Sequence, residues 1–485
     1  MSIGAYIGIG LGGLLAAFLF VLVLRTLACG LRRRRPAVPE RHLPIAECDA
    51  YAKRLATLIQ CPTVSSKEGH DDVPFAQFRE RLRGLFPLIH EHLQFQSFGD
   101  GCLVYRCAGR DDGRNIIVMS HHDVVATDGQ DWKRPPFSGD IVDGKLWGRG
   151  TVDTKTPLFA EMQAVEELLA EGFRPAVNVW IASSCNEEVS GNGIPLFVRW
   201  CEEQGLSFEL VLDEGGAIIQ NAMPTVSEKF AMLAVHEKGR CCMTCKASDE
   251  LGHFGLSPKG DAPVIRMAKF IAEVDRSKPF IKRLYPQVRA TFGAVAPHMA
   301  FPLRLVFSNL WCFWPILKRV LPSISAQAGT MLGTSCYFTG IQGGKYGHIQ
   351  TKDCTATAFL RCIDADDLAR DIATLRSIAR KYQITVEPTG ENEAYVPADM
   401  ALPPYGYVVG KVREIFPHAG VAPFVLPAGS DARHLTKLCP CVIRFAPIDI
   451  DPQQFSSVHS ADENISVQAV GDAVAFYREV LRGYR

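Results

Sequence analysis

Four short apolar runs constrain the fold of this chain more than any other feature. They are five or six residues long and do not alternate strictly between apolar and polar residues, which is typical of strands buried on both faces of a sheet. A helix is predicted between the first two, with Thr154 or Thr156 as its cap, Pro157 in its first turn and Gly172 at its end. The runs are NIIVM (115–119), VNVWIA (177–182), FELVL (208–212) and CVIRFA (441–446). This alternation predicts an α/β fold with a mostly parallel sheet and helices on both faces.

The middle of the chain, residues 236–390, has a different pattern. Three segments alternate between apolar and polar residues, as strands with one buried face do, and a helix is predicted from Asp366 to Tyr382. A chain of 485 residues is long enough for two or three domains. We therefore expect one α/β domain built from 46–235 and 391–485, with an α+β domain, 236–390, inserted into it.

The N-terminal segment predicts a membrane anchor over residues 1–30. Ile3 to Leu24 carries no charge and as a helix would span roughly 30 Å, the thickness of a bilayer core. A cleaved signal peptide is the alternative, but its apolar stretch is shorter and follows basic residues. Arg25 and the run Arg32 to Arg35 favour a cytoplasmic location for the rest of the chain. Residues 31–45 contain three prolines and form a stiff basic linker.

A second apolar stretch, residues 301–321, is interrupted by Arg304, Asn309, Pro315 and Lys318. We interpret it as a buried or surface-lining segment of a soluble domain. A second membrane span and a monotopic membrane contact are the alternatives. The 52 basic residues balance the 52 acidic ones, which gives no basic field for nucleic acid. Sixteen scattered cysteines do not settle the cellular compartment.

Histidine and acidic residues follow the predicted strands. Ligands of open α/β sheets bind outside the carboxyl ends of the strands, so these side chains are expected along one rim. One acid after a strand is commonly a helix cap, but four such sites in succession favour a metal centre. The residues are His121 to Asp123 after the first run, Asp153 after LWGRGTV, Glu187 and Glu188 after the second run, and Asp213 and Glu214 after the third. Imidazole and carboxylate ligands suit zinc, and carboxylates can bridge two ions.

Two spacings within this set carry chemistry of their own. In an extended segment residues i and i+2 point the same way, so Asp123 can orient the His121 ring, whereas His122 points away. The doublet Glu187–Glu188 lets one carboxylate bind metal while the other takes a proton from water. Alone, Asp153 and Asp213 have a simpler interpretation as helix caps, His459 as a surface histidine and Glu187–Glu188 as a solvated acidic pair.

The chain resembles the dinuclear-zinc aminoacylase/carboxypeptidase metallopeptidases, and most closely carboxypeptidase S and the N-fatty-acyl-amino-acid synthase/hydrolases. The matching stretches run in the family's order over about 46 to 485. They are SHHDVV (120–125), LWGRGTVDTK (146–155), CNEEVSG (185–191), LDEGG (212–216), GHFGLSPKG (252–260), GSDARH (429–434) and SVHSADENIS (457–466).

The resemblance implies a role for each site residue. His121 and Asp213 would hold one zinc ion, Glu188 and His459 the other, and Asp153 would bridge both. Glu187 would act as general base and then as general acid, with Asp123 orienting His121. His253, from the inserted lid and dimerisation domain, would stabilise the oxyanion, in one arrangement across a homodimer. Arg433 is a candidate for binding a substrate carboxylate. One stretch departs from the family: GHIQ places His348 where relatives have an asparagine.

The expected function is hydrolysis of an amide bond next to an amino acid. Two substrate classes compete: N-acyl amino acids, and short peptides cut at their C-terminus. The apolar stretch 301–321 weakly indicates a pocket for an acyl chain, and synthesis by reversal of the acylase reaction is an alternative. A membrane-anchored binding protein without turnover is a hypothesis of another class, and the intact ligand set argues against it. The side of the membrane stays open, because the arginines favour the cytoplasm whereas relatives with such anchors often face a lumen.

Overall fold

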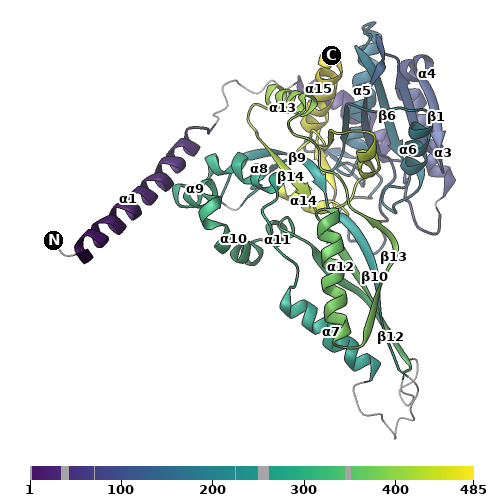
Figure 1. Cartoon of the computed structure of the whole chain (residues 1–485). Coiled ribbons are helices and arrows are strands. Elements are labelled where there is room, and N and C mark those ends of the chain that lie inside the picture. Colours follow the sequence, from purple (N-terminus) through teal and green to yellow (C-terminus); the bar gives the residue numbers. More distant parts are fainter. Residues whose placement is uncertain (1–2, 34–42, 70, 224, 250–261, 345–350) are drawn as a thin grey trace.

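A ten-stranded mixed sheet forms the larger part of the molecule (Figure 1). The computed structural model describes residues 3–33, 43–69, 71–223, 225–249, 262–344 and 351–485. The strand order is β1-β2-β6-β3-β7-β15-β9-β8-β16, with β14 paired to β9. The bounds are β1 Gln94–Phe98, β2 Cys102–Cys107, β3 Asp111–His121, β6 Val177–Ser184, β7 Leu210–Asp213, β8 Ile218–Gln220, β9 Lys229–Glu237, β14 Gly420–Leu426, β15 Val442–Arg444 and β16 Asp449–Ile450.

The four predicted strands form the centre of this sheet. β6, β3, β7 and β15 are neighbours and run parallel, whereas β1, β2 and β9 add antiparallel edges to that core. His121 at the end of β3 is paired with Ser184 at the end of β6. The carboxyl ends of these strands therefore lie at one edge, as expected from the sequence.

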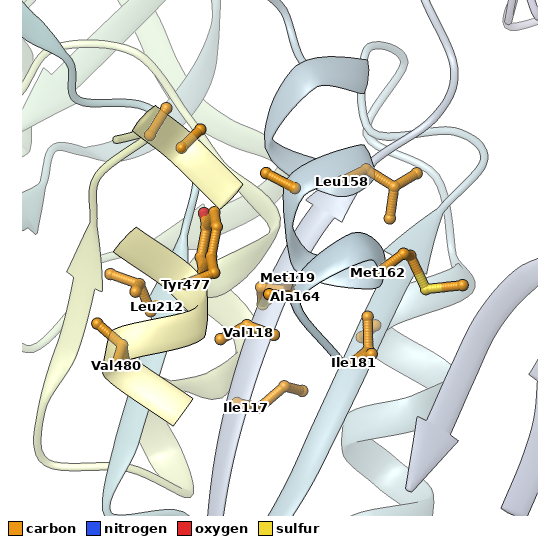
Figure 2. Close-up of a cluster of buried hydrophobic side chains, with 14 of the residues drawn as sticks. Ile117, Val118, Met119, Leu158, Met162, Ala164, Ile181, Leu212, Tyr477 and Val480 are labelled. Atoms are coloured by element: carbon orange, nitrogen blue, oxygen red, sulfur yellow. The ribbon is translucent and has the colours of Figure 1, made fainter. Parts of the chain in front are cut away.

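Helices cover both faces of the sheet. On one face, α5 (Lys155–Ala170) and α15 (Val467–Gly483) pack on the central strands. Figure 2 shows Met162 of α5 and Tyr477 of α15 in this layer with Val118 of β3. On the other face, Phe197 of α6 (Gly193–Glu203) contacts the ring of Trp180 from β6 at 6.1 Å between centroids. The remaining helices around this sheet are α2 Ile45–Ile59, α3 Asp72–Leu85, α4 Pro87–His92, α13 Pro403–Ile415 and α14 Pro452–Ser457, with the 3-10 helix η3 Asp431–Lys437.

Two smaller sheets complete the strand inventory. A four-stranded antiparallel sheet has the order β11-β12-β10-β13, and residues of β10 alternate between buried and partly or fully exposed, as the sequence predicted. Helices α7 (Pro263–Ser277) and α12 (Ala365–Arg380) pack on it. In a three-stranded sheet, β17-β5-β4, a strand from the C-terminal part of the chain pairs with two strands that follow β3. The bounds are β10 Gly239–Ser248, β11 Ser335–Gly343, β12 Asp353–Cys362, β13 Ile384–Glu393, β4 Ile141–Val142, β5 Lys145–Trp147 and β17 Asn464–Ser466.

The apolar stretch 301–321 forms two helices. α9 (Phe301–Ser308) and α10 (Leu310–Ile324) follow α8 (Pro286–Val295) and the 3-10 helix η2 (Ala296–His298), and precede α11 (Ala326–Thr330). One side of α10 packs through Leu317 and Leu321 into a hydrophobic cluster, while Ile316 and Ile324 are exposed. α10 is thus apolar on its buried side and also carries large apolar side chains on its exposed side.

The N-terminal helix α1 spans Ile3–Gly30 and is long and apolar enough to cross a membrane. It is almost entirely exposed: only Leu22 and Thr26 are buried among its described residues. Figure 1 shows it projecting from the molecule, with its C-terminal end beside α9. A signal sequence passes the same test of length and composition.

Candidate metal centre

His121 ends β3 with one ring nitrogen committed to the protein and the other facing the site. Its Nδ1 lies 3.0 Å from the backbone oxygen of Asp123 and 3.4 Å from the Asp123 carboxylate. Both are acceptors, so Nδ1 carries the proton and Nε2 keeps its lone pair for a ligand. Nε2 lies 3.0 Å from Oδ1 of Asp153.

Asp153 lies between two imidazoles. Its Oδ1 faces His121, and its Oδ2 lies 3.2 Å from Nε2 of His459. The same His459 nitrogen is 3.1 Å from the Glu188 carboxylate. Ligand atoms of His121, Asp153 and Glu188 all lie within 4.8 Å of one another. A carboxylate with one oxygen toward each imidazole is arranged to bridge two cations.

The Glu187–Glu188 doublet is held in place by Asp123. The two oxygens of this carboxylate accept the backbone N–H groups of Glu187 at 3.1 Å and of Glu188 at 3.2 Å. The Ser65 hydroxyl donates to it at 2.6 Å. Asp123 is fully buried, so one residue fixes both the His121 ring and the turn that carries the two glutamates.

Neither Asp213 nor Glu214 belongs to the group His121, Asp153 and Glu188, whose ligand atoms lie within 4.8 Å of one another among the described residues. The Asp213 carboxylate is instead occupied by backbone groups. Its Oδ1 accepts the N–H of Glu214 at 2.9 Å and its Oδ2 accepts the N–H of Ala432 at 3.0 Å. The charges of Asp153, Asp213 and His121 act on the buried carboxyl group of Glu214, which therefore lies near the cluster. Gly215 has a φ of 110°, which lets the chain turn sharply at the end of β7. Glu214, which the sequence analysis placed on this rim without a separate role, is thus a candidate ligand beside Asp213.

Glu463 is a supporting residue that the sequence analysis did not single out. Its Oε1 accepts the backbone N–H groups of Gly150, Val152 and Asp153 at 2.7 to 3.1 Å. Its Oε2 accepts a hydrogen bond of 2.6 Å from Arg149, and both side chains are buried. This carboxylate holds the loop that presents Asp153.

Burial and mutual repulsion set the charge state of the cluster. Burial raises the pKa of Glu187 and of Glu214 well above the usual range, and neighbouring carboxylates add to the effect. Burial raises the pKa of Glu188 as well. Conversely, the carboxylates of Asp153 and Glu188 raise the pKa of His459 to about 10.

This donor set fits divalent cations. The carboxylates of Asp153 and Glu188 lie against the imidazoles of His121 and His459. Without another source of positive charge, the imidazoles and the buried glutamates Glu187, Glu188 and Glu214 retain protons. Metal ions supply that charge and leave the carboxylates ionised and the imidazoles neutral, as coordination requires.

Arg433 lies on the side of Glu187, within a buried polar network. Its Nη1 donates to the carbonyl oxygen of Ser430 at 2.6 Å and lies 3.7 Å from the Glu187 carboxylate. In the part of the chain that the structure describes, its buried Nε has no hydrogen-bond partner. Behind it, Glu237 forms an ion pair with Arg444 at 3.1 Å. The arrangement leaves the Arg433 guanidinium as a buried donor next to the predicted base.

Of three further histidines named in the sequence analysis, only His122 lies among the described residues. His122 points away from the cluster, with Nδ1 2.8 Å from the Ser183 hydroxyl and its ring stacked on Phe78. His253 and His348 lie outside the described residues.

Known proteins align with most of this chain, and over most of their own length, at low sequence identity. The chain is 27% identical over 441 residues to the probable carboxypeptidase S-like 2 of Dictyostelium discoideum, covering 89% of this chain and 84% of that protein. It is 26% identical over 440 residues to the N-fatty-acyl-amino acid synthase/hydrolase PM20D1 of Homo sapiens, covering 89% and 87%.

Solved structures share the fold. The M20 family metallo-carboxypeptidase Sso-CP2 of Sulfolobus solfataricus superposes with a TM-score of 0.62 at 18% identity, covering 89% of this chain and 98% of that one. Human carnosine dipeptidase 1 gives a TM-score of 0.58 at 15% identity, covering 92% and 100%. The model of peptidase family M20/M25/M40 matches residues 117–483. The chain therefore belongs to this family of metal-dependent hydrolases, which act on peptide or amide bonds.

Proposed function

We propose that this protein is a membrane-anchored dizinc amidohydrolase that cleaves N-acyl amino acids or the C-terminal residue of short peptides. The observation that carries the proposal is the position of Asp153 between His121 and His459, next to the Glu187–Glu188 doublet. This arrangement supplies a bridging carboxylate, terminal ligands and a separate carboxylate that is free for proton transfer.

The ligand assignment follows from which side chains face the cluster. His121 and Glu214 would hold one ion, Glu188 and His459 the other, and Asp153 both. Glu214 replaces the sequence-based assignment of Asp213, because both oxygens of Asp213 accept backbone N–H groups. Imidazole with carboxylate is a ligand set that suits zinc. When bound, two zinc ions would acidify a water molecule and polarise the scissile carbonyl.

Glu187 is the proposed base. Its backbone is fixed by Asp123, and its carboxylate faces Arg433 as well as the ligand cluster. Burial raises its pKa, which improves a carboxylate as a proton acceptor near neutral pH. After the amide carbon is attacked, the same carboxyl group would return the proton to the leaving amine.

Arg433 is proposed to bind the carboxylate of the substrate's amino acid. A guanidinium fork suits a carboxylate, and the buried Nε is a donor without a partner among the described residues. Its closeness to Glu187 would place the bound amino acid beside the base. His253 stays a sequence-based prediction for oxyanion stabilisation.

The substrate class rests on the relatives, which are named both as carboxypeptidase S-like proteins and as N-fatty-acyl-amino acid synthase/hydrolases. Both names describe an amide bond to an amino acid. Hydrolysis is the proposed direction, and the synthase reaction would be its reverse. Residues Ile3–Gly30 are proposed as the anchor.

The test uses the full chain in detergent. Metal content is measured first, followed by hydrolysis of N-acyl amino acids and of short peptides with and without a chelator. Glu187→Gln should keep two zinc ions per chain and lose turnover by roughly 10²- to 10⁴-fold. Glu202→Gln, at an exposed position on α6, is the matched control and should behave as wild type. Full turnover in Glu187→Gln would refute the assignment of the base.

A further inference from the structure

A cavity lined by arginines lies where α1 meets the α8–α10 helices. Its volume is about 310 Å³. Its charged lining consists of Arg25 and Arg32 at the end of α1 and Arg289 of α8, and its apolar side includes Phe307 and Trp311. We call it the arginine pocket. In the described part of the chain, no carboxylate forms an ion pair with any of these three arginines.

Specific contacts fix α1 against the α9–α10 junction. Asn309 is fully buried, and its Nδ2 donates to the backbone oxygen of Leu22 at 3.2 Å and to the Thr26 hydroxyl at 3.3 Å. The rings of Phe18 and Trp311 meet edge to face at 5.8 Å between centroids. The start of α10 therefore lies beside the segment of α1 from Phe18 to Thr26.

The position of this contact along α1 gives its depth in a bilayer that α1 would span. Arg25 is the first charged residue after the apolar run, so it marks the boundary between hydrocarbon and headgroups if α1 spans. Phe18 lies seven residues earlier, roughly 10 Å deeper along a helix. Trp311 would then lie beside the outer hydrocarbon, and the arginines at the level of the headgroups.

The exposed side of α10 is suited to the same environment. Trp311 is 53% exposed, Ile316 60% and Ile324 65%, which is unusual for large apolar side chains facing water. Ile316 and Ile324 also line a second cavity of about 260 Å³ whose walls are apolar apart from Ser325. An apolar face beside basic residues is the composition of helices that lie in a membrane interface.

We propose that the arginine pocket binds the headgroup of an anionic phospholipid of the bilayer, whose acyl chains lie along Trp311 and the exposed face of α10. Three guanidinium groups without carboxylate partners match a phosphate and a second acidic group. This inference rests on the membrane anchoring of α1 proposed above, and it is independent of catalysis.

The test places the full chain in phosphatidylcholine vesicles that contain a minority of phosphatidylserine. Bromine atoms, which quench tryptophan fluorescence at short range, are carried by the acyl chains of one lipid or the other at equal mole fraction. The chain has six tryptophans, so the signal of Trp311 is the difference between wild type and Trp311→Phe. Brominated phosphatidylserine should quench this signal severalfold more than brominated phosphatidylcholine.

Two arginine variants test the pocket. Arg289→Gln should abolish the preference for phosphatidylserine while the chain stays resistant to carbonate washing, because α1 is unchanged. Arg276→Gln, at an exposed position on α7, should keep the preference. Equal quenching by both lipids in the wild type would overturn the proposal. Crosslinks between the α10 helices of two chains, with no quenching of Trp311 by either lipid, would also overturn it, because a second copy of the chain would then cover this face. Release of the chain by carbonate would refute the anchor and the lipid site together, while hydrolysis in detergent would still stand.

Discussion

The buried carboxylate of Glu463 accepts the backbone N–H of Asp153 at 3.1 Å. It thereby connects the C-terminal part of the chain to the loop that carries the proposed bridging ligand. The same carboxylate neutralises Arg149 at 2.6 Å, and the exposed fraction of that side chain is 1%. Residues 310 positions apart are thus joined directly beneath the candidate metal centre.

Glu463→Gln should weaken metal binding without touching a ligand. Loss of the charge leaves Arg149 buried without a counterion, which costs about 3–5 kcal/mol of folding free energy, and lets the Asp153 loop relax. Supporting residues of this kind typically change metal affinity by about 10- to 100-fold. Competition with a zinc chelator measures the affinity. Asp462→Asn is the control, because Asp462 pairs with the exposed Lys133 and should cost at most about 1 kcal/mol.

Neutralising Asp213 and neutralising Glu214, at the end of β7, should have different effects on metal content and on stability. Glu214→Gln should lower the zinc content from two ions to one, because it removes a proposed ligand. Asp213→Asn should keep both ions but lose stability by about 1–3 kcal/mol, since an amide cannot accept both backbone N–H groups. Metal analysis and urea unfolding separate the two effects. The opposite pattern would restore Asp213 as the ligand.

Arg433→Lys should discriminate between substrates by their free carboxylate. A hydrogen bond to a charged group contributes about 1.5–3 kcal/mol, so kcat/KM for an N-acyl amino acid should fall by roughly 10- to 100-fold. The methyl ester of the same substrate lacks the charge and should be little affected. Arg110→Lys, at an exposed position, serves as control. An equal loss for acid and ester would assign Arg433 to positioning Glu187 instead.

The central strands and the edge that carries the ligands could be predicted because buried parallel strands have a plain sequence signal. The runs at 115–119 and 177–182 lie within β3 and β6, and the side chains that follow them meet at one edge. Here local pattern and tertiary structure agree.

The choice between Asp213 and Glu214 could not be predicted. Adjacent side chains of a strand point in opposite directions, so the assignment depends on the residue at which β7 ends. β7 ends at Asp213, and Gly215 then turns the chain. Glu463 was missed for another reason: its role exists only once the loop at 150–153 is folded beside it, and no local spacing encodes that contact.

His122 should make the protein sensitive to acid through its buried ring. Burial lowers the pKa of His122 to about 3, whereas an unfolded histidine has a pKa near 6.5. Between these values the unfolded chain binds one more proton than the folded chain, so stability rises with pH and is lost on acidification. The contribution should approach about 1.4 kcal/mol per pH unit between roughly pH 6 and pH 4.

His122→Asn keeps a partner for the Ser183 hydroxyl but cannot take up this proton, so its unfolding free energy should fall less steeply with acid than that of wild type. Urea unfolding at several pH values measures the two slopes, with His92→Asn, an exposed position on α4, as the control. Identical slopes for wild type and His122→Asn would mean that His122 accepts its proton in the folded chain as readily as in the unfolded one.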